Sequence, residues 1–318
     1  MTDDATITAV VADQWTAADG VKAVELAAAD GAPLPPANAG AHVDVHLPGG
    51  LIRQYSLMNP GEPRYRLGVL RDESSRGGSA YIVERLRLGD RLAISAPRNH
   101  FALDESGEAY VLIAGGIGIT PLFAMAMRLT SLGRRFQLHY LVRSRTRAAF
   151  ARTLAERLQA GALTLHAEDE CGRPDLATLV GAPAPGRQLY VCGPGGLLDA
   201  VADTTRDWPA GSVRSERFRN DAAPADTAAE LPCRIELHRS GRELTLEPGE
   251  SVLECLNRAG VTVETVCQDG ICGTCAVPVI EGEVDHRDAI QTDDEKAAGD
   301  LMFVCVSRPR SERLVLDL

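Results

Sequence analysis

Four cysteines toward the end of the sequence have the spacing of ligands to a metal cluster. They are Cys267, Cys272, Cys275 and Cys305, in the pattern Cys-x4-Cys-x2-Cys followed by 29 residues and the fourth cysteine. Plant-type domains hold a [2Fe-2S] cluster with four thiolates at this spacing. Gly270 and Gly273 lie within the loop, where a backbone without a Cβ can pass close to inorganic sulfur. A structural zinc site is the alternative, but it usually takes two closely spaced cysteine pairs. The pattern favours iron and sulfur.

The remaining cysteines lack ligand spacing. Three of them, Cys171, Cys233 and Cys255, are expected to be buried as small apolar residues. The acidic start of the chain has no signal-peptide pattern, and no apolar run approaches the eighteen or so residues of a membrane span. We therefore expect a cytoplasmic protein with reduced thiols and no membrane contact.

The charge balance is acidic and uneven. The chain has 33 Lys and Arg against 44 Asp and Glu, a net charge of −11, which argues against nucleic acid as a partner. Residues 232–318 hold 17 of the acidic residues and nine of the basic ones, so this part alone carries −8. Such a surface can steer the chain to a basic protein partner, or it can serve solubility alone.

The pattern of apolar residues divides the chain. Short β-runs at 41–47, 51–58, 65–70 and 90–95, separated by Pro and Gly, predict a small barrel or sandwich. Buried strands then alternate with helices, which predicts a parallel α/β sheet; the pairs are 110–114 with 122–132, 136–142 with 148–160, and 188–192 with 197–204. The predicted domains are 1–102, 103–219 and 232–318, with a linker at 220–231 that is rich in small and acidic residues.

Two glycine turns follow predicted strands of the α/β sheet. Residues 115–121, Gly-Gly-Ile-Gly-Ile-Thr-Pro, lead from a strand into a helix, the setting in which backbone N–H groups bind a pyrophosphate. The turn departs from Gly-x-Gly-x-x-Gly, and a plain turn is the alternative. Cys192-Gly193-Pro194 ends another strand at the same sheet edge, where the cysteine either faces a ligand or is a buried thiol.

In the β-domain, Arg53 and Tyr55 share one face of a strand and Ser56 lies on the other. A second segment, Arg76-Gly77-Gly78-Ser79, precedes a helical run, so a phosphate could bind at the start of that helix. Taken singly, each segment is more often an exposed strand or a turn.

Together and in this order, the motifs resemble one family over nearly the whole chain, the class IA oxygenase reductases. The resemblance implies an antiparallel β-barrel for a flavin, a parallel α/β sheet for the nicotinamide dinucleotide, and a β-grasp-like α+β ferredoxin domain. It also implies FMN in place of FAD, because members with this Arg-Gly-Gly-Ser turn bind FMN. Pro97–Phe101 is similar to the family as well.

The family's flavin residues can be carried onto matching positions. Arg53 would contact the phosphate of FMN, Tyr55 and Ser56 its ring, and Phe218 would lie against the ring. The full FMN set implied by the resemblance is Arg53, Tyr55, Ser56, Val69, Leu70, Arg71, Gly77, Gly78, Ser79, Thr120 and Phe218.

The dinucleotide residues follow in the same way, with Cys192 near the nicotinamide. The set is Gly115, Gly116, Gly118, Thr120, Pro121, Arg143, Ser144, Cys192, Gly193 and Pro194. The arginines of the segment 143–147 could meet the 2′-phosphate of NADPH or form a solvated face, whereas the family favours NADH.

The implied reaction passes electrons from NADH to FMN, from FMN to [2Fe-2S], and from the cluster to a Rieske-type aromatic oxygenase or O-demethylase. FMN would take two electrons together and release them singly. We name no acid/base residue, because a hydride moves. Alternatives are a reductase for a cytochrome P450 and a non-catalytic redox sensor or carrier. A monomer is expected.

Overall fold

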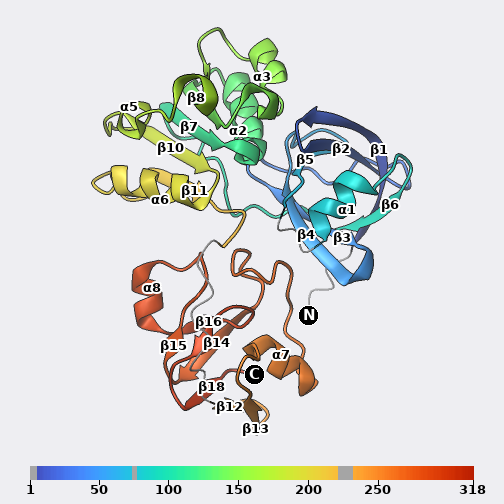
Figure 1. Cartoon of the computed structure of the whole chain (residues 1–318), viewed down its shortest axis with the longest axis vertical. Coiled ribbons are helices and arrows are strands. Elements are labelled where there is room, and N and C mark those ends of the chain that lie inside the picture. The colour runs from blue at the N-terminus through green and yellow to red at the C-terminus, as the bar shows by residue number, and fades with distance from the viewer. Residues whose placement is uncertain (1–5, 74–76, 221–231) are drawn as a thin grey trace. The chain divides into compact units, whose positions relative to one another are not determined.

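The computed structural model describes residues 6–73, 77–220 and 232–318 (Figure 1). Residue contacts group the chain into two units, Met1–Phe218 and Arg219–Leu318. Except for Asn220, the predicted linker lies outside the described residues, as does Arg76 of the predicted phosphate turn. The predicted domain boundaries stay predictions. Among the helices in the described parts, none combines the length and apolar character needed to cross a membrane.

The first unit begins with six antiparallel strands in the order β4-β3-β6-β1-β2-β5. These are β1 (Ile7–Ala18), β2 (Val21–Ala28), β3 (His42–Leu47), β4 (Leu51–Ser56), β5 (Tyr65–Leu70) and β6 (Arg91–Ile94), with η1 (Pro48–Gly50) and α1 (Gly78–Glu84) between them. The two outer strands of this order, β4 and β5, also contact each other. The sheet therefore curls into the barrel that the sequence predicted.

Four of these strands coincide with the predicted β-runs, but β1 and β2 were not predicted. Alanine occupies many positions in β1 and β2, and two of these alanines, Ala9 and Ala23, are fully buried. Alanine is depleted in strands, so composition hides them. They are held by pairing with each other and with β5 and β6.

The rest of the first unit is a parallel sheet of five strands in the order β11-β10-β7-β8-β9. The strands are β7 (Ala109–Gly115), β8 (Arg135–Val142), β9 (Leu163–Ala167), β10 (Arg187–Cys192) and β11 (Val213–Glu216). Helices α2 (Ile119–Ser131) and α3 (Ala151–Arg157) pack on one face, and α5 (Leu176–Val180) and α6 (Gly195–Thr204) on the other. The three predicted strand–helix pairs are present, and β9 and β11 extend the sheet at its two edges.

Short elements η2 (Gly116–Gly118), η3 (Arg145–Arg147) and α4 (Glu168–Cys171) follow β7, β8 and β9. Because the strands are parallel, their carboxyl ends all lie on the same side of the sheet. These turns and the one after β10 therefore meet at that carboxyl edge, where ligands of such sheets bind. Cys171 ends α4 beside the edge strand β9 and is exposed. The prediction that it is buried was wrong, because no further layer covers a one-turn helix at this edge.

The second unit is an α+β domain with a mixed sheet in the order β13-β12-β18-β14-β16. Its strands are β12 (Cys233–Leu237), β13 (Arg242–Leu246), β14 (Ala276–Glu281), β16 (Leu301–Phe303) and β18 (Arg313–Leu316), and β15 (Val284–Asp285) pairs with β17 (Arg308–Pro309). Helix α7 (Val252–Arg258) packs Val252, Leu253 and Leu256 into the core, and α8 (Asp293–Ala298) follows β15. Cys233 and Cys255 are buried in this core, as predicted.

Candidate functional site

The four predicted cluster ligands form two neighbouring pairs in the second unit. Cys275 Sγ and Cys305 Sγ lie 3.1 Å apart, and the thiol of Cys267 is hydrogen-bonded to that of Cys272. In each pair the hydrogen bond lowers the pKa of one thiol, Cys272 or Cys275, and raises that of its partner, Cys267 or Cys305. Each pair therefore favours one thiolate, the form that binds metal. Among the described residues, no three metal-binding side chains surround one point. Two thiol pairs fit a cluster of two irons.

The backbone of the cysteine loop fits a cluster as well. Gly270 has φ +66°, and a Cβ there would lie 2.6 Å from a methyl carbon of Val306. Gln268 also has a positive φ, +53°, and the N–H of Asp269 donates to Cys267 Sγ at 3.3 Å. Such N–H to sulfur bonds tune the potential of iron–sulfur centres.

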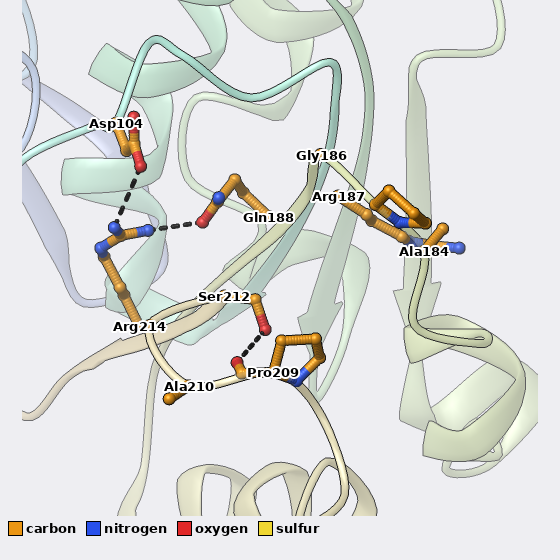
Figure 2. A pocket seen from close by; sticks show the side chains of 11 residues that line it. Asp104, Ala184, Gly186, Arg187, Gln188, Pro209, Ala210, Ser212 and Arg214 are labelled. Atoms are coloured by element: carbon orange, nitrogen blue, oxygen red, sulfur yellow. Dashed lines mark hydrogen bonds and ion pairs between the residues drawn. The ribbon is translucent and has the colours of Figure 1, made fainter.

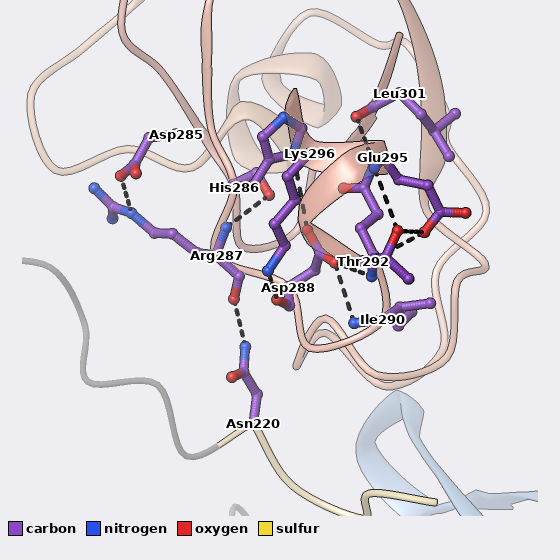
Figure 3. Close-up of polar contacts among 12 residues, drawn as sticks. Asn220, Asp285, His286, Arg287, Asp288, Ile290, Thr292, Glu295, Lys296 and Leu301 are labelled. Carbon is purple, nitrogen blue, oxygen red and sulfur yellow. Dashed lines mark hydrogen bonds and ion pairs between the residues drawn. The ribbon is translucent and has the colours of Figure 1, made fainter. Parts of the chain in front are cut away.

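Figure 3 shows polar contacts within the segment after β15, and this segment is also hydrogen-bonded to the cysteine loop. The buried carboxylate of Asp288 accepts from the backbone N–H groups of Ile290 and Gln291 at 3.1 and 2.8 Å. Lys296 Nζ donates to the carbonyl of Asp288, and the N–H of Ala289 donates to the carbonyl of Gly270 at 3.0 Å. Asp288 is a residue that the cysteine spacing did not predict, since it is contributed by a separate loop.

In the first unit, the two predicted glycine turns touch each other through their backbones. A Cβ on Gly118 would lie 2.1 Å from the carbonyl oxygen of Cys192, and one on Gly115 would lie 2.7 Å from Pro194. A Cβ on Gly193 would lie 2.9 Å from the Cα of Gly115. Only glycine allows these approaches, so the turns after β7 and β10 form one surface.

The segment after β7, which leads into α2, also contacts the barrel. Gly68 of β5 faces Thr120 and Phe150, because a Cβ on Gly68 would lie 2.7 Å from Thr120 Cγ2 and 2.9 Å from Phe150 Cε2. Thr120 is buried at the start of α2, next to Pro121, and its hydroxyl donates to the carbonyl of Ile117. The strand with the predicted flavin residues therefore lies beside the predicted dinucleotide turn.

The predicted phosphate site joins β4 to α1. The side chain of Arg53 crosses Gly78, since a Cβ there would lie 2.6 Å from Arg53 Cγ and 2.9 Å from Nε. Gly77 has φ +99° and begins the helix. A guanidinium and the first N–H groups of α1 thus lie together, which fits the phosphate of a flavin nucleotide.

The other predicted flavin residues line the neighbouring strand ends. Tyr55 lies on β4 above the barrel core, and burial raises the pKa of its hydroxyl; Ser56 after it is buried. Val69 has its side chain in the core, so it presents only backbone to a ligand. Leu70 is 38% exposed, an unusual position for leucine. Arg71 Nε donates to Glu84 at 2.6 Å, and Ser79 Oγ accepts from the N–H of Asp72.

Cys192 has a half-buried acidic neighbour, Glu216, that the sequence did not predict. Cys192 is fully buried at the end of β10, opposite Glu216 of β11 in the strand register. Burial raises the pKa of Glu216 to about 8, and its Oε2 has no hydrogen-bond partner among the described residues. Burial, and next the Glu216 carboxylate, raise the pKa of Cys192 well above the usual thiol range. Near neutral pH both groups are protonated.

Phe218 follows Glu216 by two residues and is partly buried against the core between the barrel and α2. The neighbouring Arg217 donates to Asp199 of α6 at 2.6 Å. The end of β11 thus brings the predicted ring-stacking residue to the edge that holds the glycine turns.

At the end of β8, the predicted adenosine-side residues Arg143 and Ser144 are placed at the same edge. Ser144 Oγ lies 3.1 Å from Thr146 Oγ1, and the carbonyl of Arg143 accepts from the N–H of Asp169 in α4. The next arginine, Arg145, is ion-paired with Glu170 of α4 at 2.7 Å.

A pocket of about 420 Å³ lies at the opposite edge of this sheet, where β10 and β11 begin (Figure 2). Arg214 crosses it and donates to Gln188 at 2.6 Å and to Asp104 at 3.2 Å. None of the predicted cofactor residues lines it. This pocket is distinct from the glycine-turn edge.

Comparison with known proteins agrees with this layout. The 2Fe-2S iron-sulfur cluster binding domain family matches residues 235–310. The chain is 44% identical to a vanillate O-demethylase oxidoreductase of Pseudomonas sp. (strain HR199 / DSM 7063), over 98% of this chain and 100% of that one.

Several solved structures match nearly all of this chain, among them the following two. Phthalate dioxygenase reductase, described as a modular structure for electron transfer from pyridine nucleotides to [2Fe-2S], matches with a TM-score of 0.78 and 37% identity, over 99% of each chain. An intact type IV self-sufficient cytochrome P450 monooxygenase matches with a TM-score of 0.84 and 38% identity, over 98% of this chain but only 41% of that one.

The predicted succession of antiparallel sheet, parallel sheet and [2Fe-2S] domain is confirmed, and so is the assignment to the oxidoreductases. Identity of 44% over almost the full length of a reductase component shows common family membership, and not only a shared fold. The chain belongs to the oxygenase reductase family that includes vanillate O-demethylase oxidoreductase and phthalate dioxygenase reductase.

Proposed function

We propose that this chain passes electrons from NADH through FMN and its [2Fe-2S] cluster to the oxygenase component of an aromatic-degrading system. The observation that carries the proposal is the contact of Gly68 in the flavin strand with Thr120 in the dinucleotide turn. Hydride transfer requires that donor and acceptor rings touch in a fixed orientation, and this contact brings the two sets of binding residues to one place.

For FMN, Arg53 and the turn at 77–79 would hold the phosphate, and Tyr55, Ser56 and the segment 69–71 would border the ring. When bound, FMN supplies the exchange between a hydride and single electrons. The chain's own contribution is to bind and orient, and no side chain serves as general acid or base.

For the dinucleotide, the backbone of residues 115–118 would receive the pyrophosphate and the segment 143–144 the adenosine ribose. Cys192, Gly193 and Pro194 would border the nicotinamide, with Phe218 against the flavin ring. The half-buried carboxyl of Glu216, whose raised pKa favours the protonated form, would donate a hydrogen bond beside Cys192 and help to orient the carboxamide.

For the acceptor, a Rieske-type oxygenase or O-demethylase is the first candidate, since a vanillate O-demethylase oxidoreductase is a near relative. A cytochrome P450 is the second, favoured by the match to part of a self-sufficient P450 monooxygenase. A non-catalytic redox carrier is disfavoured by the close-packed glycine turns, which a carrier does not need. The monomeric state and the cytoplasmic location stay predictions.

Replacement of one cluster ligand tests the order of the electron path. In Cys305→Ser, NADH should still reduce ferricyanide through the flavin, whereas reduction of cytochrome c through the cluster should fall to background. The exposed Cys171 offers a matched control, and Cys171→Ser should keep both activities. Equal loss of both activities in Cys305→Ser would contradict the proposed path, as would anaerobic NADH that bleaches neither chromophore of the wild type.

The phosphate role of Arg53 predicts a loss of flavin affinity. Arg53→Gln removes a charge-assisted hydrogen bond and should raise the Kd for FMN about tenfold or more. Arg85→Gln removes the same charge from the exposed far end of α1 and should change the Kd by less than twofold. Fluorescence titration of the flavin-depleted proteins measures both. Equal Kd values for Arg53→Gln and wild type would remove Arg53 from the site.

The acidic second unit predicts a salt-dependent encounter with the oxygenase. Electron delivery to a purified oxygenase should slow between about 0.01 M and about 0.15 M ionic strength, as the Debye length falls from about 30 Å to about 8 Å. Stopped-flow absorbance of the acceptor gives the rate, and NADH reduction of the flavin serves as the internal reference. A delivery rate that does not depend on salt would mean that the charge of −8 on residues 232–318 serves solubility alone.

The raised pKa of Glu216 predicts a pH-dependent stability. The folded pKa of about 8 lies above the ordinary value of 4.5, so the folded chain keeps a proton that the unfolded chain releases. The free energy of unfolding should therefore fall as pH rises from about 4.5 to about 8 and level off above it. Glu216→Gln should lack this component, whereas the exposed Glu108→Gln should retain it.

Urea unfolding followed by tryptophan fluorescence measures this, since both tryptophans, Trp15 and Trp208, belong to the first unit. If wild type and Glu216→Gln lose stability equally across this pH range, Glu216 is not a buried acid.

A further inference from the structure

The dinucleotide edge contains three arginines after β8, and one of them is already paired. Arg143, Arg145 and Arg147 are all exposed, as a cluster for a 2′-phosphate would be. Arg145 Nε, however, lies 2.7 and 2.9 Å from the two carboxylate oxygens of Glu170, and this contact raises the pKa of Arg145. Arg145 therefore faces a carboxylate of its own chain.

Glu170 is held there by the fold. It belongs to α4, which follows the edge strand β9, and β9 pairs in parallel with β8. The N–H of Asp169 donates to the carbonyl of Arg143 at 3.1 Å, so α4 is tied by its backbone to the segment that carries the arginines. The helix consequently sets the carboxylates of Asp169 and Glu170 beside that segment.

The charges of α4 and of the segment after β8 should distinguish NADH from NADPH. NADPH differs from NADH by a 2′-phosphate of nearly two negative charges. A phosphate at Arg145 would have to displace Glu170 and would also be repelled by the nearby Asp169 carboxylate, whereas a ribose hydroxyl meets no such repulsion. The hydroxyls of Ser144 and Thr146, 3.1 Å apart, are neutral partners suited to a ribose.

We propose that Glu170 selects a dinucleotide without a 2′-phosphate, by occupying Arg145 and by adding negative charge where that phosphate would bind. This inference rests on the proposed function, which puts the adenosine ribose at the end of β8. Glu170 acts through Arg145 and is a specificity-determining residue, not a catalytic one.

Four variants of the full chain, Glu170→Gln, Glu168→Gln, Arg145→Gln and the double variant, separate this role from general charge effects. Glu170→Gln removes the paired carboxylate and keeps its size. Glu168→Gln removes the same charge from the same helix, but Glu168 is paired with Arg173 at 2.8 Å, outside the arginine segment. The double variant, Arg145→Gln with Glu170→Gln, removes both partners of the ion pair. Any gain in NADP⁺ binding that depends on Arg145 should therefore be absent from it.

Titration calorimetry with NAD⁺ and NADP⁺ gives the ratio of the two Kd values, and kcat/KM for NADH and NADPH gives the same ratio in turnover. In Glu170→Gln we expect the ratio to move about fivefold toward NADP⁺, and the shift should shrink at high salt, as for exposed charge pairs. Glu168→Gln should move it less than twofold, and the double variant should show no gain over Arg145→Gln alone.

The outcomes separate a failure of the role proposed for Glu170 from a failure of the proposed function. An unchanged ratio in Glu170→Gln, or an equal shift in Glu168→Gln, overturns the role of Glu170 while dinucleotide binding stands. A wild-type protein that binds neither NAD⁺ nor NADP⁺ overturns the proposed function itself.

Discussion

The candidate site of the first unit depends on backbone contacts that only glycine permits. Gly118 lies against the carbonyl of Cys192 on one side of the turn after β7, and Thr120 lies against Gly68 on the other. A turn clamped between two strands in this way cannot shift by the width of a methyl group without a clash. The fold therefore fixes the separation of the flavin strand and the dinucleotide turn through main-chain packing, and side chains refine it.

Sequence patterns predicted what is local. The cysteine spacing predicted four ligands, because one short loop and one later cysteine carry them, and the structure brings these cysteines together as two thiol pairs. The glycine turns were evident from their positions after buried strands. Glu216 was missed for the opposite reason: its importance depends on β11 lying beside β10, which no local pattern encodes. Strands β1 and β2 were missed because their alanines are held by neighbouring strands, and the exposure of Cys171 follows from its place beyond the edge strand.

Burial decides which charges matter in this molecule. Exposed pairs such as Arg145 with Glu170 or Arg71 with Glu84 contribute little to stability, so they are free to serve specificity. The buried groups are different. In the Pro97–Phe101 segment, Arg98 pairs with the buried Asp44, and burial followed by the Arg98 charge lowers the pKa of His42 to about 4. His42 thus stays neutral near neutral pH where its ring stacks on that of His100.

The two units solve different physical problems. A hydride carrier and its acceptor must meet at a fixed distance, which the clamped turn of the first unit provides. A cluster that gains one electron needs surroundings that change little between its two charge states, since fixed dipoles then need no rearrangement. The second unit meets this need with an immobilised loop: the buried Asp288 carboxylate fixes the segment whose N–H holds the Gly270 carbonyl, and the N–H of Asp269 already points at sulfur. Both units thus position their groups through main-chain contacts. Electron and hydride transfer need this positioning and no acid/base residue.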